Sequence, residues 1–322
     1  WMLAQQQVTL KQKRGGKEMS DVKLYEVGPR DGLQNIEEFT PTSDKIDLIN
    51  RLYHAGLKEM EITSFVHPKL VPNMADAEEV FTATQDIGNF ATLVPNQKGM
   101  DRALAVGAEK INVFFSASEF FNKANLGKSM DDIIVELDAM LQETDPKNVR
   151  AYISCAFGAP NEKVDEHKLL EAMQAAQHMG DTVVLCDTIG KAHPSLIHRT
   201  LELSRHIDSE IALHLHHKAD KKDNMFPNIQ SALDWGITQF DTSIGGLGGC
   251  PFIPGSGSNL STNDMVRFLH KNEYETGLDI FELNQIAQIY SPKQVEPRTP
   301  IRLRVKNRLE ELFSKNPVSS KW

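Results

Sequence analysis

The sequence predicts an α/β fold, a (β/α)₈ TIM barrel followed by a short C-terminal helical extension. Short apolar runs alternate with amphipathic stretches from about residue 22 to about residue 272. Eight of the apolar runs have the length of a strand, which favours a closed parallel barrel over the alternative, a doubly wound open sheet. Because barrels of about 250 residues form one domain, we expect a single barrel domain over residues 21–275. A leader or tag-like segment at 1–20 would precede it, and the extension at 276–322 would follow it.

The expected strands are five to eight residues long and rich in β-branched and other apolar residues: Lys23–Val27, Glu59–Ser64, Phe90–Pro95, Lys110–Ser116, Val149–Ala156, Thr182–Thr188, Glu210–His217 and Gln239–Gly245. The segments between them place apolar residues three or four positions apart, as amphipathic helices do, for example at Ser43–Ala55, Asn96–Val106, Ser129–Glu143, Lys163–Met179 and Pro194–His206. A glycine stands between a helix and the next strand at Gly56, Gly107, Gly180 and Gly236. We expect positive φ at these four glycines, as at the end of many helices.

Composition excludes several classes of protein. Hydrophobic residues make up 40% of the chain and charged residues 25%, which is ordinary for a globular enzyme and unlike a disordered, collagenous or membrane protein. The net charge of −9 and the lack of a long basic block argue against nucleic acid as a partner. The three cysteines are far apart and form no C-x-x-C pair, which indicates a reducing compartment and a cytoplasmic protein. No apolar run near the N-terminus resembles a secretory signal, and Met19 is a plausible start of the ordered chain.

Ionisable residues follow the expected strands at their carboxyl ends. In a (β/α)₈ barrel these ends meet at one mouth, where active sites are built. The residues expected there are Arg30, Asp31, Glu61, Ser64, Asp187, Thr188, His214, His216 and the glycine-rich segment 245–250. So many functional groups at one end of the strands predict an enzyme active site at the mouth.

The segment Ile211–His217 predicts a metal site. Side chains two positions apart share one face of a strand, so His214 and His216 would lie close enough to share one ion. An H-x-H pair alone is a weak signal, and the carboxylate of Asp31 is the natural third ligand. The alternative for Asp31 is a turn residue, because Arg-Asp-Gly is also good turn chemistry. Mg²⁺, Mn²⁺ and Zn²⁺ all suit such ligands.

Several ordered motifs resemble the hydroxymethylglutaryl-CoA lyase family, the metal-dependent acyl-CoA lyases of a TIM-barrel lyase and synthase superfamily. They are Tyr25-Glu-Val-Gly-Pro-Arg-Asp-Gly-Leu-Gln-Asn35, Glu61-Ile-Thr-Ser-Phe-Val-His-Pro-Lys69, Cys186-Asp-Thr-Ile-Gly190, the two histidines, Gly245-Gly-Leu-Gly-Gly-Cys-Pro251 and Gly257-Ser-Asn-Leu260. The resemblance covers about residues 22 to 275. Related synthases that condense acetyl-CoA with 2-oxo acids typically have Glu at the position of Leu33 and lack the GLGGCP loop, so the lyase branch is preferred.

The resemblance implies one divalent ion, Mg²⁺ or Mn²⁺, held by Asp31, His214, His216 and Asn259, and no organic cofactor. It further implies cleavage of 3-hydroxy-3-methylglutaryl-CoA, or a close analogue, to acetyl-CoA and a 3-oxo acid, as in leucine degradation. Arg30 would stabilise the developing enolate, and Glu61 would orient Arg30. Asp187 would act nearby, as a supporting residue or as a base.

The remaining site residues also come from the resemblance. Cys250 would donate a proton to the enolate from a glycine-rich loop that folds over the substrate. Gln34 and Ser64 match substrate-contacting positions, and Asn125 is a candidate for binding the CoA tail. Its neighbours Asn122, Lys123 and Lys128 offer further donors and charge, and a solvated lysine loop is the alternative.

One departure from the family bears on the substrate. After His216 the family usually continues with Asp-Thr and a short turn, whereas this chain reads His217-Lys-Ala-Asp-Lys-Lys-Asp-Asn-Met-Phe-Pro227, about three residues longer. The lysines there favour a more anionic or bulkier 3-hydroxyacyl-CoA, or they form a solvated loop. A synthase and an acyl-CoA-binding protein without turnover are the other hypotheses. The binding protein is the weaker of the two, because binding alone needs no such cluster of catalytic residues.

The C-terminal extension is the expected contact for a homodimer. Pro292, Pro297 and Pro300 precede an amphipathic stretch at Ile301–Lys315. This stretch is expected either to cap the barrel or to join two copies of the chain.

Overall fold

A computed structural model describes residues 22–36, 38–142, 144–159, 165–217, 225–248 and 257–290. Eight strands form one parallel sheet: β1 Lys23–Glu26, β2 Glu61–Ser64, β3 Ala91–Leu93, β4 Lys110–Ser116, β5 Val149–Ser154, β6 Thr182–Cys186, β7 Glu210–His214 and β9 Gln239–Thr242. Their order in the sheet is β1-β9-β7-β6-β5-β4-β3-β2. A parallel bridge between Glu26 and Met60 brings the two edge strands together. The expected (β/α)₈ barrel is therefore confirmed; β4 has the expected bounds, and the other strands are shorter than expected by one to three residues at an end.

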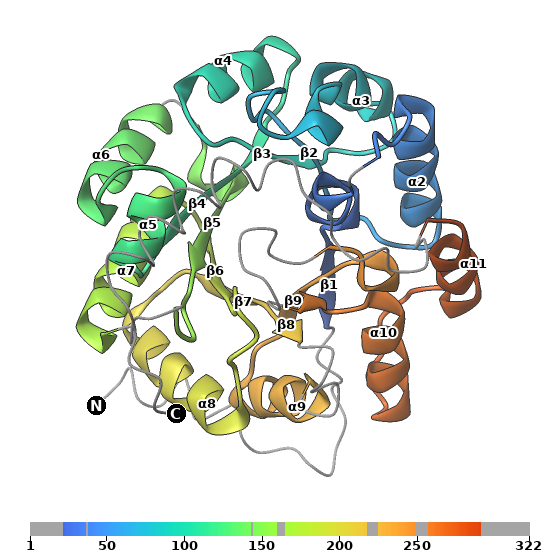
Figure 1. Cartoon of the computed structure of the whole chain (residues 1–322). Helices are drawn as coiled ribbons and strands as arrows, with labels where there is room; N and C mark the ends of the chain where they lie inside the picture. The colour runs from blue at the N-terminus through green and yellow to red at the C-terminus, as the bar shows by residue number, and fades with distance from the viewer. Residues whose placement is uncertain are drawn as a thin grey trace, which may run out of the picture.

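Helices surround the strands in a ring (Figure 1). They are α2 Thr42–His54, α3 Ala77–Thr84, α4 Gln97–Ala105, α5 Glu119–Asn125, α6 Met130–Met140, α7 Glu166–Met179, α8 Pro194–Leu203, α9 Met225–Trp235, α10 Thr262–Lys271 and α11 Ile280–Tyr290. Several of these helices start after a residue whose side chain caps the helix N-terminus. On α6, Ser129 and Asp132 form a reciprocal capping box. No helix in the described ranges is both long enough and apolar enough to cross a membrane.

Two short segments beside the barrel carry site residues. Gly28–Gly32 (η2) follows β1 as a single wide helical turn, and Ile244–Gly246 (η8) follows β9. The amide N–H groups of Arg30, Asp31 and Gly32 all bond to the carbonyl of Val27, which folds the residues after β1 into a tight turn at the barrel mouth.

The prediction of a single strand over residues 210–217 is wrong in one respect, because the strand ends at His214. His216 and His217 form a separate short strand, β8, which pairs antiparallel with β10, Ser258–Asn259. The buried Leu215 lies between the two strands, and its carbonyl accepts a hydrogen bond from the Leu260 amide. Pairing with β10 thus takes His216 out of the barrel sheet and sets it beside Asn259.

The glycine prediction holds at three of four positions. Gly56, Gly107 and Gly236 have φ of 105°, 81° and 110°. Gly180 is extended instead, with φ of −166°. A Cβ at Gly180 would lie 2.4 Å from the carbonyl oxygen of Val149. Glycine is therefore needed at position 180 because β5 lies too close for a side chain, and not because the backbone is left-handed.

The core fills the barrel and the space between strands and helices. Helix α11, in the predicted extension, packs against α2 and α10, and its Leu283 and Ile286 are fully buried. The amphipathic stretch expected at Ile301–Lys315 lies outside the described residues.

Candidate metal centre

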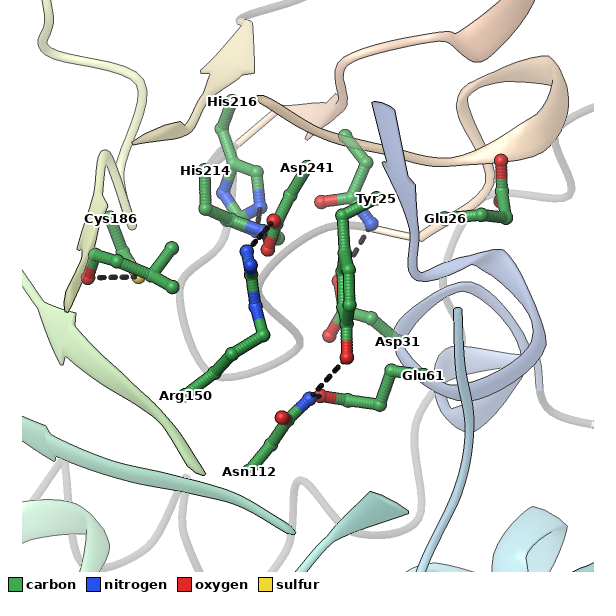
Figure 2. A network of polar contacts seen from close by, with 12 residues as sticks. Tyr25, Glu26, Asp31, Glu61, Asn112, Arg150, Cys186, His214, His216 and Asp241 are labelled. Atoms are coloured by element: carbon green, nitrogen blue, oxygen red, sulfur yellow. Dashed lines mark hydrogen bonds and ion pairs between the residues drawn. The ribbon is translucent and has the colours of Figure 1, made fainter. Parts of the chain in front are cut away.

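Asp31, His214 and His216 converge at the barrel mouth (Figure 2). One potential ligand atom from each of them lies within 4.8 Å of the others, and all three residues are buried. Asp31 comes from η2, His214 from the last residue of β7 and His216 from β8. Three separate elements thus place an oxygen and two nitrogens around one point.

Hydrogen bonds orient both imidazoles so that Nδ1 points toward an acceptor and Nε2 toward the other imidazole. Nδ1 of His214 lies 3.2 Å from Asp241 Oδ2, and Nδ1 of His216 lies 3.2 Å from the carbonyl oxygen of Thr188. A carboxylate and a carbonyl only accept hydrogen bonds, so each Nδ1 carries the proton. Both Nε2 atoms then hold lone pairs, and they face each other at 3.0 Å. A shared cation relieves the repulsion between the two lone pairs.

Asn259 adds an oxygen at the same place. Its Nδ2 donates to Asp31 Oδ2 at 2.6 Å and to the Leu247 carbonyl at 2.9 Å, which fixes the direction of the amide. Its Oδ1 is buried and has no hydrogen-bond partner within the described part of the chain. A buried, unpartnered amide oxygen is costly unless a ligand or ion completes it. The four residues therefore fit a divalent cation, with two neutral nitrogens, a carboxylate and an amide oxygen as donors.

Electrostatics keep these donors in their ligating forms. Burial, with His214 as the next cause, lowers the pKa of His216 to about 4, so this imidazole is neutral at physiological pH. Burial acts to raise the pKa of Asp31. The Arg30 charge, the two histidines and the Asn259 amide nevertheless hold it below its ordinary value. The site thus presents an anionic carboxylate beside the neutral imidazole of His216.

Arg30 lies next to the candidate ligands. Its Nε is ion-paired with Glu61 Oε1, and its Nη1 lies 2.8 Å from Asp31 Oδ1. The second carboxylate oxygen of Glu61 accepts a hydrogen bond from Asn112 Nδ2. Arg30 is 7% exposed and Glu61 is fully buried, so the guanidinium has one fixed direction. Glu61 and Arg30 therefore form a buried ion pair beside Asp31.

The other predicted site residues differ in what they contact. Gln34 belongs to the centre, since its Nε2 donates to Asp31 Oδ1 at 2.7 Å. Ser64 donates to the Leu93 carbonyl at 3.2 Å. Asp187 accepts from the amides of Lys191 and Ala192 at 2.7 and 3.0 Å, and it thereby shapes the turn that carries Thr188. Asn125 is the last residue of α5, and Cys250 lies outside the described residues.

The candidate CoA-binding residues Asn122, Lys123 and Asn125 lie in helix α5, and Lys128 follows it. Asn122 is buried, and both ends of its amide bond to the backbone of Ser116, at 2.9 and 2.8 Å. Lys128 is ion-paired with Glu136. Asn122 is therefore structural in this fold, because its donor and acceptor are already used.

Glu26 is a residue that the motif contained but the sequence reasoning did not single out. Its Oε1 accepts from the amides of Gly28 and Ile244 at 2.9 and 2.8 Å, and its Oε2 accepts from the Thr262 hydroxyl at 2.6 Å. It is fully buried. Glu26 thus ties together the start of η2, the start of η8 and the first turn of α10.

Glu26 gives the protein a pH-dependent stability that can be measured. Burial, its largest influence, raises the pKa of Glu26 from 4.5 to about 7. A carboxyl whose pKa rises on folding destabilises the fold once it is ionised. Its penalty is absent below about pH 4.5, grows as the pH rises from about 4.5 to about 7, and levels off above pH 7 at about 3 kcal/mol at most. We expect Glu26→Gln to lose this pH dependence in urea unfolding at pH 5.5 and pH 8.

Glu78→Gln is the matched control for Glu26. A hydrogen bond from Arg102 is the largest cause that lowers the pKa of Glu78, so its contribution to stability has the opposite sign and is lost as the pH falls. If the difference in unfolding free energy between wild type and Glu26→Gln were the same at both pH values, the assignment for Glu26 would be wrong.

Comparisons with known proteins agree with the geometry. The HMGL-like family model matches residues 21–289. The hydroxymethylglutaryl-CoA lyase YngG of Bacillus subtilis is 40% identical over 284 residues, which cover 86% of this chain and 94% of that protein. A solved HMG-CoA lyase from Bacillus subtilis has a TM-score of 0.79 and 38% identity over 89% of this chain and 98% of its own. An HMG-CoA lyase from Acinetobacter baumannii, solved in complex with coenzyme A and 3-methylmalate, has a TM-score of 0.77 and 29% identity, covering 94% and 97% of the two chains.

Proposed function

The chain belongs to the HMGL-like family, and from this premise we propose that it is a divalent-metal-dependent carbon–carbon lyase that cleaves 3-hydroxy-3-methylglutaryl-CoA to acetyl-CoA and acetoacetate. The observation that carries the proposal is the candidate metal centre with Arg30 fixed beside Asp31. The relatives are named for this activity, and one relative was solved with coenzyme A. An acyl-CoA substrate is the partner that these findings support.

The bound ion would polarise the 3-hydroxyl and a neighbouring oxygen of the substrate, so that a modest base can remove the hydroxyl proton. The adjacent carbon–carbon bond then breaks, a ketone forms, and the electron pair passes to the acetyl thioester as its enolate. Arg30, held by Glu61 and Asp31, would donate to the enolate oxygen. A proton from the Cys250 thiol to the enolate carbon completes acetyl-CoA and leaves acetoacetate as the second product.

The contacts support a division of roles. Gln34 is bonded to Asp31, and this position beside a candidate metal ligand supports its proposed contact with the substrate. Asp187 uses its carboxylate on two backbone amides, so we assign it to the turn that supports His216 through Thr188 rather than to proton transfer. Ser64 and Asn125 remain proposed contacts of the acyl and CoA parts.

Mg²⁺ or Mn²⁺ is the proposed ion, because two of the four candidate donors are oxygens, from the Asp31 carboxylate and the Asn259 amide, and such oxygens suit these ions.

Two further proposals concern the setting of the enzyme. Cys186 is a buried free cysteine, which is consistent with the reducing cytoplasm. A homodimer is supported by α11, where Phe281 and Ile289 are 77% and 59% exposed.

The proposed reaction is tested by acetyl-CoA release from 3-hydroxy-3-methylglutaryl-CoA. Metal-stripped protein is assayed with and without Mg²⁺ or Mn²⁺, beside Cys250→Ala. We expect release that depends on the ion and is lost in the variant. If the protein binds the ion but releases nothing, the substrate is another acyl-CoA, and the loop after His216 is the first place to look. Consumption of acetyl-CoA with a 2-oxo acid would indicate a synthase instead.

A further inference from the structure

We propose that Asp241, held by Arg150, is a positioning residue that presents Nε2 of His214 to the metal ion and so sets the affinity of the site. This inference rests on the proposed metal centre, but not on the identity of the substrate. The sequence reasoning named neither residue.

Asp241 lies directly beside His214 in the barrel. The two residues are paired in the register of β7 and β9, and Asp241 is 2% exposed. Each of its carboxylate oxygens has a different partner. Oδ2 lies 3.2 Å from His214 Nδ1, and Oδ1 lies 2.8 Å from Arg150 Nη2. Asp241 therefore joins the imidazole to a cation in the barrel interior (Figure 2).

Arg150 is held so that it cannot turn away. It comes from β5, and its Nη1 donates to Gln239 Oε1 at 3.0 Å. Gln239 and Asp241 are two residues apart on β9, so one guanidinium bonds two side chains of the same strand face. The guanidinium carbon also lies 3.9 Å from the centre of the Tyr25 ring. This rigid cation supplies the countercharge that a buried carboxylate needs.

The carboxylate controls which nitrogen of His214 can bind a metal. As an acceptor only, it keeps the proton on Nδ1 and leaves the lone pair on Nε2, the nitrogen that faces His216. A carboxylate behind a ligating imidazole also makes it a better donor, and losing such a partner typically weakens metal binding about 10- to 100-fold. His216 has only the neutral carbonyl of Thr188 in the equivalent place. Asp241 thus makes His214 the stronger nitrogen ligand.

A purely structural ion pair is the competing explanation, and the chain offers a matched control for it. Lys45 and Asp76 form another buried pair, with 2.7 Å between Nζ and Oδ1, and they link α2 to the residue before α3. Asp76→Asn removes one buried carboxylate from its cation, as Asp241→Asn does. Both variants lose stability, but only Asp241→Asn touches a metal ligand.

The test is Mn²⁺ affinity, measured by isothermal titration calorimetry on the full chain. We expect Asp241→Asn to bind Mn²⁺ about 10- to 100-fold more weakly and Asp76→Asn to stay within about twofold of wild type. An amide has one accepting atom where the carboxylate has two, so it cannot serve both His214 and Arg150. Unchanged affinity in Asp241→Asn would overturn the proposal.

A second measurement needs no variant. The ¹⁵N chemical shifts of His214 in the wild-type protein report which ring nitrogen carries the proton, and we expect Nδ1. A proton on Nε2 would overturn the proposal even if Asp241→Asn failed to fold. Tight Mn²⁺ binding that weakens in Asp241→Asn, without release of acetyl-CoA from 3-hydroxy-3-methylglutaryl-CoA, would reject the proposed reaction and leave this inference standing.

Discussion

Replacing Arg30 with Gln will lower acetyl-CoA release from 3-hydroxy-3-methylglutaryl-CoA about 100- to 1000-fold. The enolate formed on bond cleavage carries its charge on the thioester oxygen, and Arg30 is the cation fixed beside the candidate metal ligands. Loss of one preorganised donor to a developing oxyanion costs about this much in other enzymes. The effect should fall on kcat, because the interaction is strongest after charge has developed.

Metal affinity separates this role from a general disturbance of the site. Arg30 contacts Asp31 but is not among the candidate ligands, so we expect Arg30→Gln to bind Mn²⁺ within about tenfold of wild type. Arg30→Lys keeps a cation for Glu61, yet it cannot reproduce the fork of the guanidinium, so we expect it to recover only part of the activity. Activity within tenfold of wild type in Arg30→Gln would exclude Arg30 as the stabilising group.

Arg102 provides the control for losing a paired arginine. It bonds Glu78 and the carbonyls of Phe65 and Val66, and it links α4 to its surroundings. We expect Arg102→Gln to lose stability and keep its kcat.

The eight barrel strands and the location of the site could be predicted from the sequence. Buried parallel strands are short continuous apolar runs, and an ionisable residue at the end of such a run is visible without knowing the fold. Asp31 and His214 were identified in this way. The break after His214 could not be predicted, because it depends on pairing between β8 and β10, whose residues are about forty positions apart.

The supporting residues were missed for a physical reason. Arg150, Asn112 and Asp241 lie inside strands, and their partners are found across the barrel interior. Glu26 bonds to Ile244 and Thr262, more than two hundred residues away. Strand periodicity tells which face a side chain occupies, but not which neighbour it meets once the barrel closes. Asp187 could be read as a base or as a turn residue, and only its two amide contacts favour the turn.

Asp31→Asn will remove metal binding, and with it catalysis. Asp31 is the one anionic group among the four candidate ligands, and a cation bound by imidazoles and an amide alone loses most of its charge stabilisation. Both carboxylate oxygens of Asp31 now accept hydrogen bonds, Oδ1 from Arg30 and Gln34 and Oδ2 from Asn259, so the NH₂ group of an asparagine faces a donor in either orientation. We expect Mn²⁺ affinity to fall at least about 100-fold.

Thermal unfolding with added Mn²⁺ measures the loss of Mn²⁺ binding directly. An ion at 100 times its dissociation constant stabilises the folded protein by about 2.7 kcal/mol, so wild type should melt at a higher temperature with Mn²⁺ than without it. Asp31→Asn should keep at most about 0.4 kcal/mol of this stabilisation, so its melting temperature should change little with Mn²⁺, whereas Asp76→Asn should keep the increase. If Mn²⁺ stabilised Asp31→Asn as much as wild type, the ion would be bound elsewhere, and the facing nitrogens of His214 and His216 would need another explanation.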